Sequence, residues 1–131
     1  MSEPKKNSIL IVDDETSNIM VLTHILSHKY TIYAVKNGKN AIAAAEKHLP
    51  DIILLDVLMP DMDGYTVITE LKKTDKTKNI PVIFITGLTD TGDEEKGIAL
   101  GACDYIKKPF SSSIVEEKVE NQIRLLNEKN V

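Results

Sequence analysis

The sequence predicts a single α/β domain, built on a doubly wound, five-stranded parallel sheet with helices on both faces. Five short apolar runs are bounded by polar residues, glycine or proline, and each is typical of a strand that is buried on both faces. Segments with helical periodicity alternate with these runs, which favours βαβ units joined by right-handed crossovers. The 131 residues suffice for one domain with its own core, so no internal boundary is expected.

The elements are expected in a regular order along the chain. Runs of apolar, β-branched and aromatic residues predict strands at 8–12, 30–35, 51–56, 81–86 and 104–107. Apolar residues at three- and four-residue steps, or strong helix formers, predict helices at 16–28, 40–47, 64–73, 93–100 and 113–126. Thr16 or Ser17 can cap the first helix, and Ser113 with Glu116 has capping-box spacing at the start of the last. The predicted strand order is 2-1-3-4-5, which is the flavodoxin-like order.

Composition narrows the class of protein. The apolar content of 42% and the formal net charge of -4 argue against disorder and against a surface built to bind nucleic acid. The N-terminus has no apolar signal core and no run reaches ~18 apolar residues, so we expect a cytoplasmic protein without a membrane segment. The domain is expected over residues 8–127, between flexible terminal segments 1–7 and 128–131. The single cysteine, Cys103, can form neither an internal disulfide nor a zinc site and is expected in the core.

Acidic residues stand where two of the predicted strands end. Asp13 and Asp14 come directly after the first strand, and Asp56 closes the third. In the predicted order these two strands flank the switch point, so their carboxyl ends should bring the three carboxylates together. Crowded like charges disfavour full ionisation, and a hard divalent cation with oxygen ligands relieves the repulsion. Mg²⁺ is therefore the expected cofactor.

The other strand ends add a hydroxyl and a cation to the same edge of the sheet. Thr86 closes the fourth strand, and the fifth ends in Lys107 and Lys108, followed by Pro109. Spacing alone leaves open which lysine reaches the crevice. A carboxylate can attack phosphorus to give an aspartyl-phosphate, while a metal ion and a lysine stabilise the charge on the transferred group. Asp56 is the strongest candidate for that nucleophile.

In these residues and their spacing, the chain resembles the receiver domain of bacterial two-component response regulators. The resemblance covers roughly residues 8–126. Any one of its motifs is common, whereas all of them in order are specific. They are the acid pair Asp13-Asp14, the acid Asp56 followed by Met59-Pro60 and Asp63-Gly64, Thr86 at the end of the fourth strand, and Lys108-Pro109 after the fifth.

The resemblance implies how the site would work. Asp14, Asp56 and the backbone carbonyl of Leu58 would bind Mg²⁺, with Asp13 acting through water. Asp56 would accept a phosphoryl group from the phosphohistidine of a sensor histidine kinase or a phosphotransfer protein. Lys108 would pair with a phosphoryl oxygen. Such a domain is a signalling switch rather than a turnover enzyme.

The resemblance also implies a conformational change. Thr86 would turn inward to hydrogen-bond the phosphoryl group, and Tyr105, in the position of the family's switch aromatic, would rotate inward with it. The Lys108–Pro109 peptide bond would be cis. The apolar side chain of Leu58 stands where several relatives carry a polar one that positions the hydrolytic water, and it leaves the lifetime of the phosphoryl group open.

Two other functions stay open from the sequence. A phosphatase or phosphotransferase with an aspartyl-phosphate intermediate would need a general acid beside Asp56, and the sequence offers no clear one. A constitutive interaction module would keep the fold without phosphorylation, which the intact acid set argues against. An apolar stripe on the last helix is expected to be its inner face, with a homodimer contact or a connection to an output domain or downstream protein as alternatives; it comprises Val115, Val119, Gln122 and Leu126.

Overall fold

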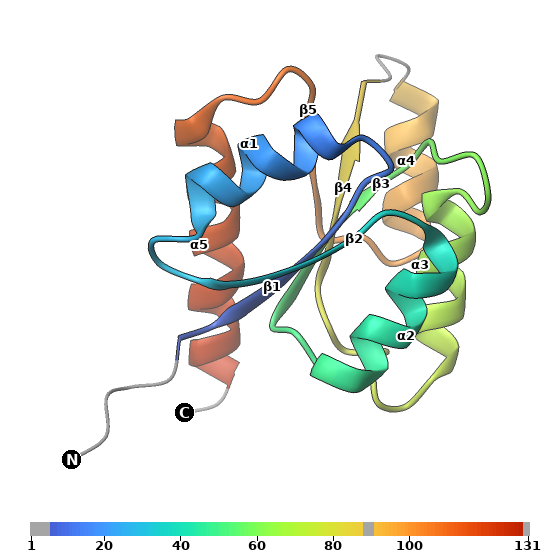
Figure 1. The fold of residues 1–131 in the computed structure, drawn as a ribbon. Coiled ribbons are helices and arrows are strands. Elements are labelled where there is room, and N and C mark those ends of the chain that lie inside the picture. Colours follow the sequence, from blue (N-terminus) through green and yellow to red (C-terminus); the bar gives the residue numbers. More distant parts are fainter. Residues whose placement is uncertain (1–5, 88–90, 130–131) are drawn as a thin grey trace.

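The computed structural model describes residues 6–87 and 91–129 of the chain. Its strands form one parallel sheet in the predicted order, β2-β1-β3-β4-β5 (Figure 1). The strands are β1 (Ser8–Val12), β2 (Thr31–Val35), β3 (Ile52–Asp56), β4 (Val82–Thr86) and β5 (Asp104–Lys107). Tyr30 precedes β2 rather than opening it, because its N–H donates to the Leu26 carbonyl in the turn after the first helix.

Strand burial follows from the position of each strand in the sheet. Every residue of β3 and β4 is buried, which explains why these strands are unbroken apolar runs. Successive side chains of a strand point to opposite faces, so Leu10 and Val12 pack in one core cluster and Ile9 and Ile11 in the other. The two clusters hold the sheet rigid between its helix layers, and the strand ends are therefore firmly placed.

The helices cover both faces of the sheet. They are α1 (Thr16–Leu26), α2 (Gly38–His48), α3 (Gly64–Lys73), α4 (Thr91–Ala99) and α5 (Ser112–Lys129). Helices α1 and α5 lie on one face, and α2, α3 and α4 lie on the other (Figure 1). Val115 and Val119 of α5 are fully buried, while Gln122 and Leu126 are half-buried. The predicted inner face of the last helix is therefore confirmed.

The start of α1 differs from the prediction. Neither Thr16 nor Ser17 caps this helix; the N-cap residue is Glu15, and its side chain makes no capping hydrogen bond. Instead, the Glu15 N–H donates to Asp13 Oδ1 at 2.9 Å. The turn between β1 and α1 is thus organised by a carboxylate of the candidate site, a contact that the preference for serine and threonine caps does not anticipate.

Two further expectations are wrong. Helix α5 begins one residue earlier than expected, and the Val115 N–H donates to the Ser111 carbonyl, so Ser113 lies inside the first turn and cannot be the N-cap. Cys103 is exposed rather than part of the core, because it lies in the turn that precedes the edge strand β5. Cysteine is buried on average, but at a sheet edge position outweighs that average.

The described residues include only part of the two terminal segments. Of the terminal segments expected to be flexible, residues 1–5 and 130–131 lie outside the described residues, and α5 continues to Lys129. At the other end, Asn7 and the Ser8 N–H both hydrogen-bond the Asp51 carboxylate before β3. Within residues 6–87 and 91–129, no helix has the length and apolar character needed to cross a membrane.

Candidate metal-binding and phosphoacceptor site

The carboxyl ends of adjacent strands bring the three acids together. Asp13 and Asp14 follow β1, and Asp56 is the last residue of β3. The two strands are neighbours, with Val12 opposite Leu55, so the next pair in register is Asp13 and Asp56. Oxygens of all three carboxylates lie within 4.8 Å of one another. The convergence expected from the strand order is therefore present in the structure.

Asp13 is fully buried, and its two carboxylate oxygens have different surroundings. Oδ1 accepts the Glu15 N–H, whereas Oδ2 has no hydrogen-bond partner within the described part of the chain. The nearest cation to Oδ2 is the Lys108 ammonium, with Nζ at 3.7 Å. A buried carboxylate oxygen without a donor is costly unless a cation or ordered water compensates for its charge. The negative charge of the Asp13 carboxylate is therefore only partly balanced, and the site favours a further cation.

Burial perturbs the acidity of Asp56. The residue is 3% exposed, and its burial, reinforced by the neighbouring Asp13 carboxylate, raises the pKa of Asp56 to about 7. Two contacts oppose that rise: Lys108 Nζ lies 3.5 Å from Oδ1, and the Leu58 N–H donates to Oδ1 at 3.4 Å. Burial therefore favours the protonated form of the metal-free Asp56 carboxyl.

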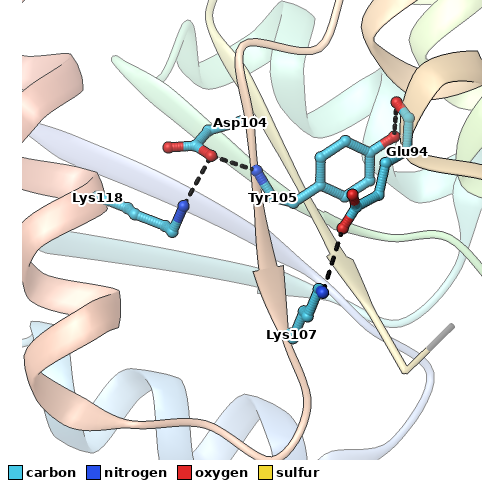
Figure 2. A network of polar contacts seen from close by, with 5 residues as sticks. All are labelled: Glu94, Asp104, Tyr105, Lys107 and Lys118. Atoms are coloured by element: carbon cyan, nitrogen blue, oxygen red, sulfur yellow. Dashed lines mark hydrogen bonds and ion pairs between the residues drawn. The ribbon is translucent and has the colours of Figure 1, made fainter. Parts of the chain in front are cut away.

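The structure distinguishes the two lysines that end β5. Lys108 Nζ contacts both Asp13 and Asp56, whereas Lys107 Nζ lies 3.5 Å from Glu94 Oε1 on α4 (Figure 2). The alternation of side chains at a strand end sends consecutive residues in opposite directions, so one lysine enters the site and the other leaves it. The Lys108–Pro109 peptide bond is cis, as the resemblance implies.

A small cavity above the acids opens to the surface. Its volume is about 190 Å³, and its lining comprises Asp14, Glu15, Asp56, Val57, Leu58, Thr86, Gly87 and Lys108. Thr86 is 2% exposed, while the side chain of Leu58 is 62% exposed and lies at the mouth. A methyl group added at Gly87 would meet no atom within 4 Å. Among residues 6–87 and 91–129, no atom blocks the entrance next to Gly87, and the cavity can admit a group the size of phosphate.

Tyr105 is buried between α4 and β4. It is 9% exposed, and its hydroxyl donates to the Glu94 carbonyl at 2.6 Å (Figure 2). The sequence did not single out Glu94, nor Glu15 at the cavity. Glu15 could have been included because it directly follows the acid pair, whereas nothing in the sequence pattern connects α4 to Tyr105.

Comparison with known proteins identifies the family. A model of the response regulator receiver domain matches residues 9–120 of the chain. The chain belongs to the response regulator receiver domain family. Receiver domains serve in two-component signalling, so the domain is a signalling module.

Sequence relatives of this receiver domain are longer proteins. It is 37% identical over 131 residues to a probable cyclic di-GMP phosphodiesterase of Vibrio cholerae, and 40% identical over 117 residues to the response regulator PleD of Caulobacter vibrioides. These matches cover 100% and 88% of the chain but only 30% and 26% of the two relatives. The receiver domain thus spans less than a third of the length of these proteins.

A solved structure supports the likeness of the fold and bears on the metal. The receiver domain of the sensor histidine kinase PA1611 of Pseudomonas aeruginosa matches with a TM-score of 0.83 and 30% identity, over 90% of this chain and 98% of that one. The PA1611 structure holds a magnesium ion coordinated in its active-site cleft. In this receiver domain, Asp13, Asp14 and Asp56 form an acidic cluster that could hold a metal ion.

Proposed function

We propose that this receiver domain is a phosphorylation-dependent switch that accepts a phosphoryl group on Asp56 from the phosphohistidine of a sensor histidine kinase or phosphotransfer protein. The observation that carries the proposal is the surroundings of Asp56. Its carboxylate is buried beside two other acids, with Lys108 Nζ at 3.5 Å, under a cavity that opens to solvent. A nucleophile, a cation and room for an incoming group thus occur together.

The proposed transfer is a single displacement at phosphorus. An Asp56 carboxylate oxygen attacks, the new O–P bond forms, the P–N bond to the donor histidine breaks, and the imidazole keeps the electron pair. Lys108 neutralises charge on the phosphoryl oxygens, and Thr86, at the end of β4, turns to donate its hydroxyl to one of them. Tyr105 follows Thr86, so the surface of β4, β5 and α5 changes with the state of Asp56.

The acid cluster fits Mg²⁺. All of its donors are oxygens, which Mg²⁺ prefers, and the buried Asp13 Oδ2 lacks a hydrogen-bond donor among residues 6–87 and 91–129. Asp14, Asp56 and the Leu58 carbonyl would hold the ion, with Asp13 acting through water. When bound, the ion would offset the repulsion among the acids and the charge of the phosphoryl group.

Partners and location follow from the same role. The phosphodonor would be a histidine kinase or a phosphotransfer protein, and the matched PA1611 domain is itself the receiver of a sensor histidine kinase. The phosphodiesterase and PleD relatives are each more than three times as long as this chain, so the readout would pass to an output domain or a separate downstream protein, with or without a homodimer. We place this activity in the cytoplasm, where a lone exposed thiol such as Cys103 stays reduced.

Intact mass spectrometry tests the phosphoacceptor. With Mg²⁺ and acetyl phosphate, the wild type is expected to gain the mass of one phosphoryl group, and Asp56→Asn is expected to gain none because the amide is not a nucleophile. The matched control is Asp75→Asn, the same change at an exposed carboxylate, which should be phosphorylated like the wild type. A wild type that never gains this mass would indicate a constitutive interaction module. Release of many phosphates per chain at a steady rate would indicate a phosphatase.

Metal binding has its own readout. A saturating concentration of MgCl₂ at pH 7.5 is expected to raise the thermal midpoint of the wild type by about 3 °C or more, since a ligand that binds only the folded state stabilises it. Asp14→Asn should lose most of that rise, whereas Asp75→Asn should keep it. Equal shifts in all three proteins would show that the ion does not bind at the acid cluster.

A further inference from the structure

Tyr105 is held inward by contacts with α4 on one side and β4 on the other. Its hydroxyl donates to the Glu94 carbonyl at 2.6 Å, and its ring centroid lies 5.8 Å from that of Phe84. Glu94 is also tied to β5 by its ion pair with Lys107, as Figure 2 shows. Helix α4 and strand β5 therefore close around the ring.

A glycine of α4 lies directly against this ring. Gly97 is three residues after Glu94, so it shares the face of α4 that covers Tyr105. A Cβ atom added at Gly97 would overlap the Tyr105 hydroxyl and would come within 2.8 Å of Phe84 Cδ2 and Cε2. The inward position of Tyr105 thus requires that residue 97 have no side chain.

Backbone geometry does not explain the glycine. Gly97 lies inside α4, where φ is negative and any residue fits, and glycine weakens a helix relative to alanine. Gly101, just after α4, is the glycine with positive φ, at 114°. The absence of a side chain at position 97 is therefore explained by space for Tyr105 and Phe84.

Of the two rings, Tyr105 is the one that lies next to open space. Phe84 is fully buried on β4 and is backed by Tyr65, whose ring meets it edge-on with centroids 5.4 Å apart. Tyr105 is bordered by two surface cavities of about 450 and 430 Å³, both of which also border Glu94. A side chain at position 97 would therefore displace Tyr105 outward into that space rather than push Phe84 inward.

We propose that Gly97 is the positioning residue that admits Tyr105 to its inward position, and that the identity of residue 97 sets the balance between the inward and outward positions. This inference rests on the proposed function in one respect, namely that the position of Tyr105 is the readout of Asp56. The requirement for space at residue 97 is independent of phosphorylation. By linkage, a variant that favours the outward position also weakens the coupling between Asp56 and the α4–β5 surface.

Nitration of tyrosine followed by peptide mass spectrometry tests the proposal in the unphosphorylated chain. In Gly97→Ala, the nitration rate of Tyr105 is expected to rise about fivefold or more, since an overpacked contact shifts a two-state equilibrium by at least that factor. Tyr30, which is buried away from α4, serves as an internal reference. The control is Leu125→Ala, at a side chain of α5 that is 45% exposed and lies on the other face of the sheet, and its Tyr105 should react like that of the wild type.

A second variant tests whether overlap between a side chain at residue 97 and the Tyr105 hydroxyl causes the effect of Gly97→Ala. Tyr105→Phe removes the hydroxyl that the alanine side chain would strike, so Gly97→Ala should destabilise the Tyr105→Phe background less than it destabilises the wild type. If Gly97→Ala alone does not fold, the double variant is expected to regain folding. Unchanged Tyr105 nitration in a folded Gly97→Ala, or equal destabilisation in both backgrounds, would overturn the proposal.

Phosphorylation provides the last measurement. In the wild type, acetyl phosphate with Mg²⁺ should lower Tyr105 nitration further, and in Gly97→Ala it should leave Tyr105 more reactive than in the phosphorylated wild type. Intact mass measured in parallel separates the two ideas. A wild type without added phosphate refutes the proposed function, while nitration of the unphosphorylated chains still decides the role of Gly97.

Discussion

Replacing Asp56 by asparagine is expected to stabilise the metal-free protein at pH 8 by about 1–3 kcal/mol, although it removes the proposed phosphoacceptor. Burial beside Asp13 raises the pKa of Asp56 from its ordinary 3.8 to about 7. One pKa unit corresponds to about 1.4 kcal/mol, so this rise sets a ceiling of about 4 kcal/mol. An amide of the same shape avoids the cost of a buried charge and can still accept the Leu58 N–H.

The sign of the pH dependence follows from the same shift. Between about pH 4 and pH 7, the folded chain keeps a proton on Asp56 that the unfolded chain has lost. The free energy of unfolding of the wild type, measured by urea denaturation in EDTA, should therefore fall as the pH rises through this window. Asp56→Asn should lack this fall, because it has no group that titrates at this position.

Mg²⁺ should reverse the order of stability, so that the wild type becomes more stable than Asp56→Asn. A bound ion stabilises the ionised carboxylate, so saturating MgCl₂ should raise the stability of the wild type far more than that of Asp56→Asn. Asp75→Asn, at an exposed carboxylate, should follow the wild type under every condition. If Asp56→Asn is no more stable than the wild type at pH 8 in EDTA, burial of this carboxylate carries no cost and the interpretation of the site is wrong.

The sheet and its strand order were predictable because the burial of a strand is evident from the residues of that strand alone. A central parallel strand must be apolar on both faces, and the run Ile52 to Leu55 carries that requirement without reference to any other part of the chain. Crossover rules then place the carboxyl ends of β1 and β3 side by side, which is enough to bring Asp13 next to Asp56. Site residues at strand ends are thus as predictable as the strands themselves.

Which of two adjacent residues enters the site was not predictable from spacing. Lys107 and Lys108 both follow the apolar core of β5, and only the twist and register of that strand decide that Lys108 reaches Asp56 while Lys107 pairs with Glu94. The resemblance to known receiver domains supplied that assignment. A local pattern fixes the alternation of side chains but leaves open which face the first residue takes.

Contacts between distant segments could not be predicted from the sequence either. Gly97 and Tyr105 come from different elements, and neither carries a pattern that names the other. The start of α1 is a different case, because the Glu15 N–H donates to the Asp13 carboxylate, only two residues earlier, in place of a side-chain cap. There a local contact overrides the average preference for serine and threonine caps, whereas the contact between Gly97 and Tyr105 becomes visible only in three dimensions.

Phe84→Ala is expected to have the largest effect on stability, lowering the free energy of unfolding by about 3–5 kcal/mol. The ring of Phe84 is fully buried on β4 between Tyr65 and Tyr105, with centroid distances of 5.4 Å and 5.8 Å. Its removal loses the burial of a large apolar surface and leaves a cavity that the rigid central strand cannot close. Urea denaturation with an unchanged slope would measure the loss directly.

Two further variants test whether this loss of stability is specific to the cluster of Tyr65, Phe84 and Tyr105. Leu125→Ala, at a side chain that is 45% exposed, should change the free energy of unfolding by no more than about 0.5 kcal/mol. Because a methyl at residue 97 would press on the Phe84 ring, Gly97→Ala should cost less in the Phe84→Ala background than in the wild type. Strict additivity of those two changes would mean that Phe84 does not form the wall against which Tyr105 is positioned.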